Sequence, residues 1–130
     1  MEARDTHLLE LRCETFGIVN NECSSEEAFQ NKILRPILKI QNDLFIQVFI
    51  NYAIKQKNVF FSLTPEKKMM YIENVIQRDI KFRNSLKGMI IALFTLEEYA
   101  EYICISSNLN KRMMNMLIER LKSQMQLIEQ

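Results

Sequence analysis

The chain is poor in the residues that form tight turns. Its 130 residues include only two glycines and two prolines, and tryptophan is absent. β-Sandwiches and barrels need many such turns, so this scarcity argues against both and favours helices joined by short loops. Polar and apolar residues never alternate over more than a few positions, so no strand is predicted. The nearest approach to a strand, Asn58 to Leu63, is expected to be a loop.

A large charge of one sign is also missing. The chain has 17 basic and 16 acidic side chains, which leaves a net charge of +1. Because no overall field attracts polyanions, neither nucleic acid nor a membrane is expected as a partner. The most apolar stretch, Leu44 to Ile54, is much shorter than the roughly 20 residues that a bilayer requires. The first residues lack the basic and apolar segments of a secretion signal, so a cytoplasmic location is expected.

Residues suited to metal binding or nucleophilic catalysis are scarce. There are one histidine and three cysteines, and the cysteines show no C-x-x-C spacing, which argues against a zinc site or a disulfide framework. His7 shares one side of a predicted helix with Glu10 and Glu14, a spacing that suits metal ligands. A helical metal site draws its ligands from several helices, so we interpret these three residues as a solvated polar face. No catalytic residue, metal or cofactor is predicted.

Helical periodicity divides the chain into five or six helices. The expected segments are residues 5–14, 25–33, 36–57, 65–94, 96–104 and a last helix from about 106 almost to the C-terminus. The segment 65–94 is longer than most globular helices, which leaves room for a bend between Arg78 and Asn84. Pro36 cannot sit inside a straight helix, so a bend is predicted at Leu34–Arg35.

Four helix starts carry capping signals, and the last of them is Ser106-Ser107-Asn108, which supplies cap residues for the final helix. Ser24 and Glu27 have the spacing of a capping box, and so do Thr95 and Glu98. Thr64-Pro65 combines a cap residue with a proline at the first helical position.

Residues 37 to 54 are predicted to form the centre of the fold. Their apolar side chains occupy almost the whole helix circumference, and a helix of this kind packs on several sides. We therefore predict an all-α fold with one domain over residues 1–130. Its architecture is an irregular bundle of five or six helices, two of them long, packed around residues 37 to 54.

Two polar residues fall on apolar helix faces and mark a candidate ligand site. Asp79 lies on the apolar face of the segment 65–94, and Gln41 interrupts the apolar face of the central helix. A buried carboxylate needs a cation or several donors, so Arg83, Arg35 or Gln41 is the expected partner of Asp79. These four residues form the candidate ligand-binding site. The alternative is a structural hydrogen bond, or a kink at Asp79 that would account for its position.

The last helix carries an apolar arc that reaches almost to the end of the chain. Its spacings of three and four residues resemble those of a coiled-coil seam, and methionine suits adaptable interfaces. We therefore hypothesise that the arc is an interface with a protein partner or with a second copy in a homodimer. The alternative is that the arc docks on its own bundle. Its members are Met114, Leu117, Ile118, Leu121, Met125 and Ile128.

Several segments of the sequence resemble those of a known protein family. They include Leu34-Arg35-Pro36-Ile37-Leu38-Lys39, Tyr71-Ile72-Glu73-Asn74 and Leu109-Asn110-Lys111-Arg112-Met113-Met114-Asn115. With these segments the chain resembles a family of short uncharacterised bacterial proteins, mainly of the Bacteroidetes group, to which automated naming often attaches "glyoxalase". The resemblance implies a bacterial cytoplasmic source and no established activity. Glyoxalase domains are built from βαβββ units and hold a metal on several strands, so the residues do not support that label.

The composition and patterns together lead to two functional expectations. The first is a small cytoplasmic, non-enzymatic interaction or adaptor protein that binds a protein partner or a second copy of itself. The alternative is a small-molecule-binding or enzymatic site in the bundle around Asp79, Gln41 and Arg83.

Overall fold

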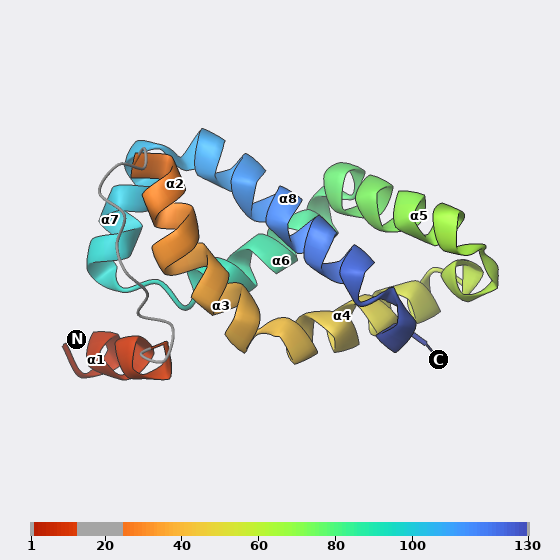
Figure 1. Cartoon of the computed structure of the whole chain (residues 1–130), viewed down its shortest axis with the longest axis horizontal. Coiled ribbons are helices and arrows are strands. Elements are labelled where there is room, and N and C mark those ends of the chain that lie inside the picture. Colours follow the sequence, from red (N-terminus) through yellow and green to blue (C-terminus); the bar gives the residue numbers. More distant parts are fainter. Residues whose placement is uncertain (1, 13–24, 130) are drawn as a thin grey trace.

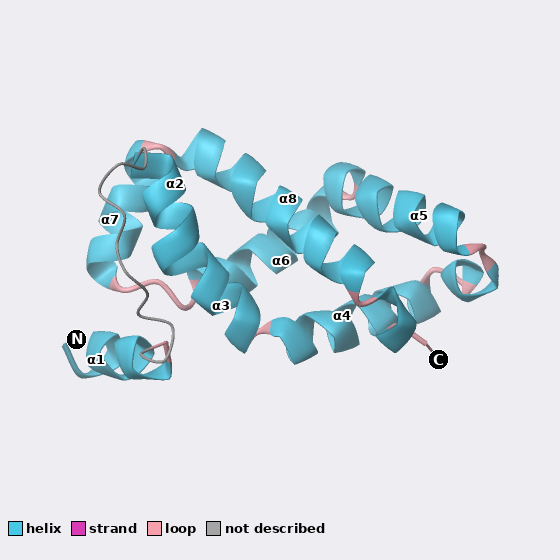
Figure 2. Ribbon diagram, in the orientation of Figure 1, coloured by secondary structure: helices cyan, strands magenta, loops and turns pink. Residues whose placement is uncertain are grey.

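The structure is all-α wherever it describes the chain. This computed structural model describes residues 2–12 and 25–129, and no strand occurs within them (Figure 2). The predicted fold class is thereby confirmed. The elements are the α-helices α1 (Glu2–Leu11), α2 (Ser25–Phe29), α3 (Arg35–Ile40), α4 (Asn42–Lys55), α5 (Pro65–Arg78), α6 (Ile80–Ile91), α7 (Leu96–Cys104) and α8 (Ser106–Ser123), the π-helix η2 (Gln30–Leu34), and the 3-10 helices η3 (Val59–Ser62) and η4 (Met125–Leu127).

The bundle is organised around α8. This helix crosses the middle of the molecule and packs against α5, α6, α7 and η2 (Figure 1). The expected centre, residues 37 to 54, belongs instead to α3 and α4, which follow one side of the bundle. Neither of the two expected long helices is continuous, because 36–57 and 65–94 are each divided in two.

The bend predicted at Leu34–Arg35 is replaced by a π turn. Residues 25–40 are helical without interruption through α2, η2 and α3, and the Arg35 N–H donates to the Gln30 carbonyl. Proline has no N–H, and its ring crowds the carbonyl four residues earlier in an α-helix. The wider π turn directly before Pro36 accommodates it without ending the helix.

The central helix breaks at Gln41 instead. Gln41 leaves the helical region (φ −87°, ψ 1°), and α3 and α4 run in different directions on either side of it (Figure 1). Helix α4 then ends at Lys55, and Lys57 and Asn58 adopt left-handed backbone conformations. The predicted loop at Asn58–Leu63 contains the short helix η3.

Three of the four predicted helix starts are described, and two of them, at Thr64 and Thr95, are confirmed. The third is wrong, because α8 begins after Ile105 and has no side-chain cap. The Thr64 hydroxyl accepts a hydrogen bond from the Lys67 N–H at 3.4 Å. Thr95 and Glu98 form the full capping box, with bonds of 2.9 and 3.2 Å between each side chain and the other residue's N–H. Ser24, of the remaining predicted start, lies outside the described residues.

The apolar arc of α8 faces the interior of the bundle. Five of its side chains are buried, and the sixth, Met125, packs against the same core; the five are Met114, Leu117, Ile118, Leu121 and Ile128. The arc therefore docks on its own bundle, which is the alternative stated for it, and this burial argues against its use as an interface. Helix α8 also stops at Ser123, followed by η4, rather than reaching almost to the C-terminus.

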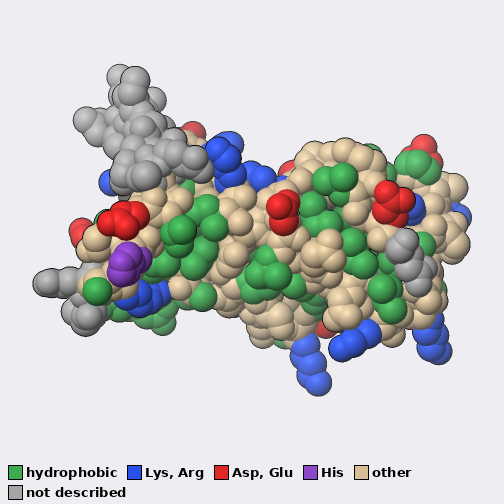
Figure 3. Space-filling model, turned by 90° about the horizontal axis from the view of Figure 1, so that it is seen from below, with side chains coloured by type: hydrophobic (Ala, Val, Ile, Leu, Met, Phe, Trp, Pro, Cys, Tyr) green, Lys and Arg blue, Asp and Glu red, His purple; other side chains and the backbone are tan. Residues whose placement is uncertain are grey.

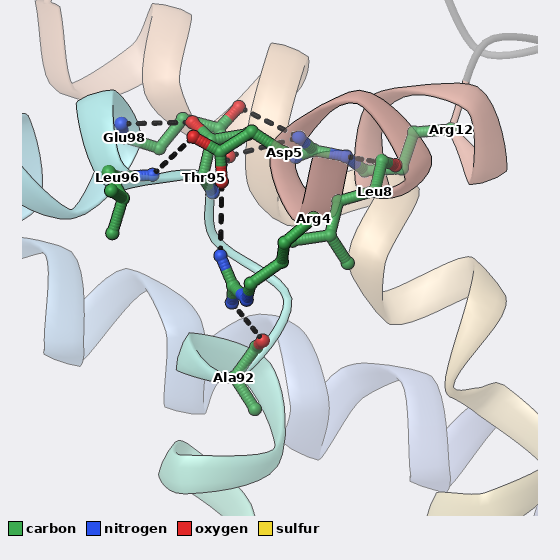
Figure 4. A network of polar contacts seen from close by, with 8 residues as sticks. All are labelled: Arg4, Asp5, Leu8, Arg12, Ala92, Thr95, Leu96 and Glu98. Atoms are coloured by element: carbon green, nitrogen blue, oxygen red, sulfur yellow. Dashed lines mark hydrogen bonds and ion pairs between the residues drawn. The ribbon is translucent and has the colours of Figure 1, made fainter. Parts of the chain in front are cut away.

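Helix α1 is attached to the start of α7 by polar contacts (Figure 4). The Arg12 guanidinium donates to both carboxylate oxygens of Glu98 at 3.0 Å, and Arg12 is only 4% exposed. Asp5 accepts a hydrogen bond from the Leu96 N–H at 3.3 Å, while Arg4 donates to the Ala92 carbonyl at 2.8 Å. Helix α1 covers Glu2–Leu11 and so begins earlier than predicted, while residues 13 and 14 of the predicted segment lie outside the described residues.

None of the helices within the described residues has the length and apolarity needed to cross a bilayer.

Candidate functional site

Asp79 lies at the break between α5 and α6, where its carboxylate caps α6. The backbone leaves the helical region here (φ −82°, ψ 95°). One carboxylate oxygen accepts a hydrogen bond from the Tyr52 hydroxyl at 2.6 Å, and the other accepts one from the Phe82 N–H at 3.2 Å. The Tyr52 bond and then the Phe82 bond hold the pKa of the Asp79 carboxyl below its usual range. The kink weighed as an alternative is therefore present.

Tyr52 and Phe82 also stack on each other. Their ring centroids are 4.0 Å apart, and Phe49 lies against both rings. Burial, followed by the hydrogen bond to Asp79, raises the pKa of the Tyr52 hydroxyl. A tyrosine held neutral and a carboxylate held ionised form one stable pair, which joins α4 to the α5–α6 break.

The side chains of Gln41 and Arg35 are bonded elsewhere, and the Asp79 carboxylate is bonded by Tyr52 and Phe82 rather than by its predicted partners. The Gln41 side-chain amide donates to the Met89 carbonyl of α6 at 3.1 Å. Arg35 donates through Nε to the Asn31 side chain at 2.8 Å. Arg83 contacts Asp79 through its backbone N–H, at 2.8 Å from the Asp79 carbonyl. Asp79 and Gln41 are explained by the two helix breaks that they stabilise.

A different group of polar residues lines a cleft between α8 and the continuous helix formed by η2 and α3. The cleft has a volume of about 620 Å³, which is within the usual range for ligand pockets. We call it the arginine cleft. Its lining residues are Gln30, Arg35, Leu38, Arg112, Asn115, Met116, Glu119, Arg120, Ser123 and Gln124.

Amide groups bridge the arginine cleft at its two ends. At one end Arg112 of α8 donates through one terminal nitrogen to the Gln30 side-chain oxygen at 2.8 Å. At the other end Arg120 donates to the Asn42 side-chain oxygen at 3.2 Å. Asn42 and Gln124 exchange two further amide hydrogen bonds, of 2.7 and 2.6 Å. Each guanidinium is thus oriented by a neutral oxygen and keeps its remaining N–H donors.

The arginine cleft carries an excess of positive charge. Three guanidinium groups line it against one carboxylate, that of Glu119, which leaves two positive charges in excess. Among the described residues, the ion-pair partner of Glu119 is Lys122, whose ammonium lies 3.8 Å from a Glu119 oxygen, and not an arginine of the cleft. Among the described residues, Arg35, Arg112 and Arg120 all take amide oxygens rather than carboxylates as partners. Their charge therefore remains available to an anion.

The outer face shown in Figure 3 has a different character. Acidic and basic side chains are scattered over it singly, and apolar side chains form several separate groups. This distribution agrees with the net charge of +1 and produces no field of one sign on that face. The concentration of like charge in the cleft is a local feature.

Sequence reasoning missed this cleft apart from Arg35. A weak signal was present in the last helix, where Arg112, Met116, Arg120 and Gln124 recur every fourth residue opposite the apolar arc. The amides that orient the arginines come from Gln30 and Asn42, which are distant in sequence and give no periodic signal. The sequence alone therefore does not predict the cleft, because the fold brings its two walls together.

The described residues contain no group of three or more potential metal-ligating side chains of His, Cys, Asp or Glu. His7 and Glu10 are exposed on α1, and Glu14 lies outside the described residues. No protein-family model, curated protein or solved structure matches the chain.

Proposed function

We propose that this protein is a non-enzymatic interaction module that binds an acidic segment of a partner protein in the arginine cleft. The observation that carries the proposal is the pairing of Arg112 and Arg120 with neutral amides. A guanidinium whose partner is a carboxylate has its charge neutralised, whereas one oriented by an amide keeps its charge and is already positioned for an incoming carboxylate.

The residues between the two arginines also suit a partner protein. Met116, which is half-buried, gives the cleft an apolar part, and Leu38, only 1% exposed, belongs to its wall. Asn115 and Ser123 add neutral polar groups. Interfaces commonly combine apolar contacts with a few oriented polar groups, and both arginine and methionine are enriched in them. The alternative site around Asp79, Gln41 and Arg83 gains no support, because the first two residues form bonds that maintain the fold.

The cytoplasmic location and the bacterial family resemblance remain parts of this proposal. Both rest on the sequence features described above.

The proposal is tested with a short glutamate-rich peptide and its glutamine counterpart, each carrying a fluorescent label. Fluorescence anisotropy should show binding of the glutamate peptide that weakens as salt rises, because salt screens ion pairs. The double variant Arg112→Gln/Arg120→Gln should lose this binding while keeping amide-capable side chains toward Gln30 and Asn42.

A matched control removes the same charge elsewhere. Arg78 and Lys67 are exposed on α5, and their side chains take part in none of the cleft contacts. Arg78→Gln/Lys67→Gln should bind the glutamate peptide like the parent. Equal loss of binding in both double variants would contradict the proposal, since it would show a response to net charge alone.

A further inference from the structure

We infer that the segment bound in the arginine cleft is extended and carries two acidic side chains about four residues apart, with an apolar residue midway between them. This inference rests on the proposed function and specifies the chemistry of its partner. It follows from the positions of the two bridging arginines and of the apolar residues between them.

The first step is the spacing of the cations. Arg112 and Arg120 both line the cleft and belong to the same helix. At the helical rise per residue, their backbone positions are separated by about 12 Å along the axis of α8. The two guanidinium groups do not converge, because Arg112 is held by Gln30 and Arg120 by Asn42, twelve residues further along the chain. Full use of the cleft therefore requires two acidic groups.

The second step converts this distance into a peptide spacing. An extended chain advances about 3.3 Å per residue, so about 12 Å corresponds to three or four residues. Side chains of an extended chain alternate between its two faces. Two acidic side chains that point into the cleft must therefore be separated by an even number of positions, which selects about four.

The third step concerns the residue between the two acids. In an extended segment, the side chain midway between them points to the same face. The cleft places Leu38 and Met116 among its lining, and Met116 lies midway between Arg112 and Arg120 in sequence. An apolar side chain at the midpoint would contact Met116, whose flexible thioether adapts to several apolar shapes.

Arg35 adds charge on the opposite wall. It is the first residue of α3, and along the chain it lies between Gln30 and Asn42, the residues that bond Arg112 and Arg120. Its Nε is directed to Asn31, which leaves its terminal nitrogens to face an acidic segment. We expect Arg35 to contribute less than the two bridging arginines because it is more exposed than either of them.

The test uses labelled peptides of one composition and different order. The matched peptide has two glutamates about four residues apart with leucine at the midpoint. The second has the same residues with the glutamates adjacent, and the third has glutamines in their place. The full-length protein is titrated with each peptide by fluorescence anisotropy, and so are the Arg112→Gln and Arg120→Gln variants.

The matched peptide should bind about tenfold more tightly than the adjacent-glutamate peptide, because only the former reaches both charged hydrogen-bond sites. Either single arginine variant should abolish that preference while retaining the weaker binding of one acidic group. Circular dichroism of the bound peptide should show no gain of helix.

The other outcomes separate the inference from the proposed function. Equal affinities for the two glutamate peptides, both lost in the arginine double variant, would overturn the spacing and leave the proposed function standing. A gain of peptide helix on binding would overturn the extended geometry alone. No binding beyond that of the glutamine peptide would overturn both, and so would tighter binding of a single-stranded oligonucleotide of equal charge.

Discussion

Arg12 and Arg112 belong to different regions of the molecule and have chemically different partners. Arg12 is buried against the carboxylate of Glu98, and the pair holds α1 to the start of α7. Arg112 is partly exposed in a cleft and is held by the neutral amide of Gln30. In the first region the Glu98 carboxylate neutralises the charge of Arg12. In the second region the Gln30 amide orients Arg112 and leaves its charge in place. This difference separates an arginine that maintains the fold from one that is available to a partner.

The same division runs through α8. One face of this helix supplies Leu117 and Leu121 to the core, and another supplies Arg112 and Arg120 to the cleft. Substitutions on the first face should change the free energy of unfolding, and those on the second should change binding.

The largest effect is expected for Leu121→Glu. Leu121 is 1% exposed, so the substitution buries a carboxylate without a partner and removes apolar contacts. We expect the free energy of unfolding to fall by more than about 4 kcal/mol, enough to unfold a protein of ordinary stability. Circular dichroism at neutral pH measures the outcome. A folded variant that differs from the parent only in sedimentation would instead show that the arc is a dimer interface.

Arg12→Gln comes next. The substitution leaves the Glu98 carboxylate largely buried without its guanidinium partner, and breaking a buried ion pair in this way costs about 3 kcal/mol. Urea denaturation measures the loss. Arg4→Gln is the control, because Arg4 is exposed and both its hydrogen bond to the Ala92 carbonyl and its ion pair with Asp5 are at the surface. Exposed pairs of this kind contribute at most about 1 kcal/mol. Equal effects of the two variants would show that Arg12 does not anchor α1.

Asp79→Ala tests a third polar group that serves the fold. The variant loses the cap of α6 and leaves the Tyr52 hydroxyl without its acceptor, so we expect destabilisation of about 2 kcal/mol in urea denaturation. Peptide binding by the remaining folded protein should be unchanged. An effect on binding with unchanged stability would instead favour the site first predicted around Asp79.

The pH dependence of stability follows from the same carboxyl. Its pKa is lowered in the folded protein, so the unfolded state takes up a proton first as the pH falls. The contribution of Asp79 is therefore complete above the ordinary aspartate pKa of about 4 and is lost as the pH falls through the lowered folded pKa. Stability curves of the parent and Asp79→Ala should converge in that acidic range. Curves that stay parallel below pH 4 would contradict the Tyr52–Asp79 pairing.

Local rules were sufficient for much of the fold. The all-α class follows from periodicity and from the scarcity of turn residues, and the caps at Thr64 and Thr95 depend on groups within one helical turn. Pro36 misled the prediction because a π turn can absorb a proline within a continuous helix. The sequence does not reveal whether the chain bends before Pro36 or forms a π turn there, since tertiary packing decides between the two.

Gln41 and Asp79 show why the candidate site was harder to predict. Both were recognised as polar residues on apolar faces, and both were assigned to a ligand site. Each instead marks a helix break, and their partners, the Met89 carbonyl and Tyr52, come from other helices. A polar residue on an apolar face thus signals a special position without saying whether a ligand or the chain itself satisfies it.

The most direct test of the central claim measures stability and binding on the same variant. Arg112→Gln/Arg120→Gln should change the free energy of unfolding by less than about 0.5 kcal/mol, because both side chains lie in an open cleft and glutamine can still bond the facing amides. The same protein should bind the matched glutamate peptide at least about tenfold more weakly than the parent does. A variant that unfolds like Arg12→Gln, or one that binds the peptide as tightly as the parent, would contradict the distinction between neutralised and available arginines.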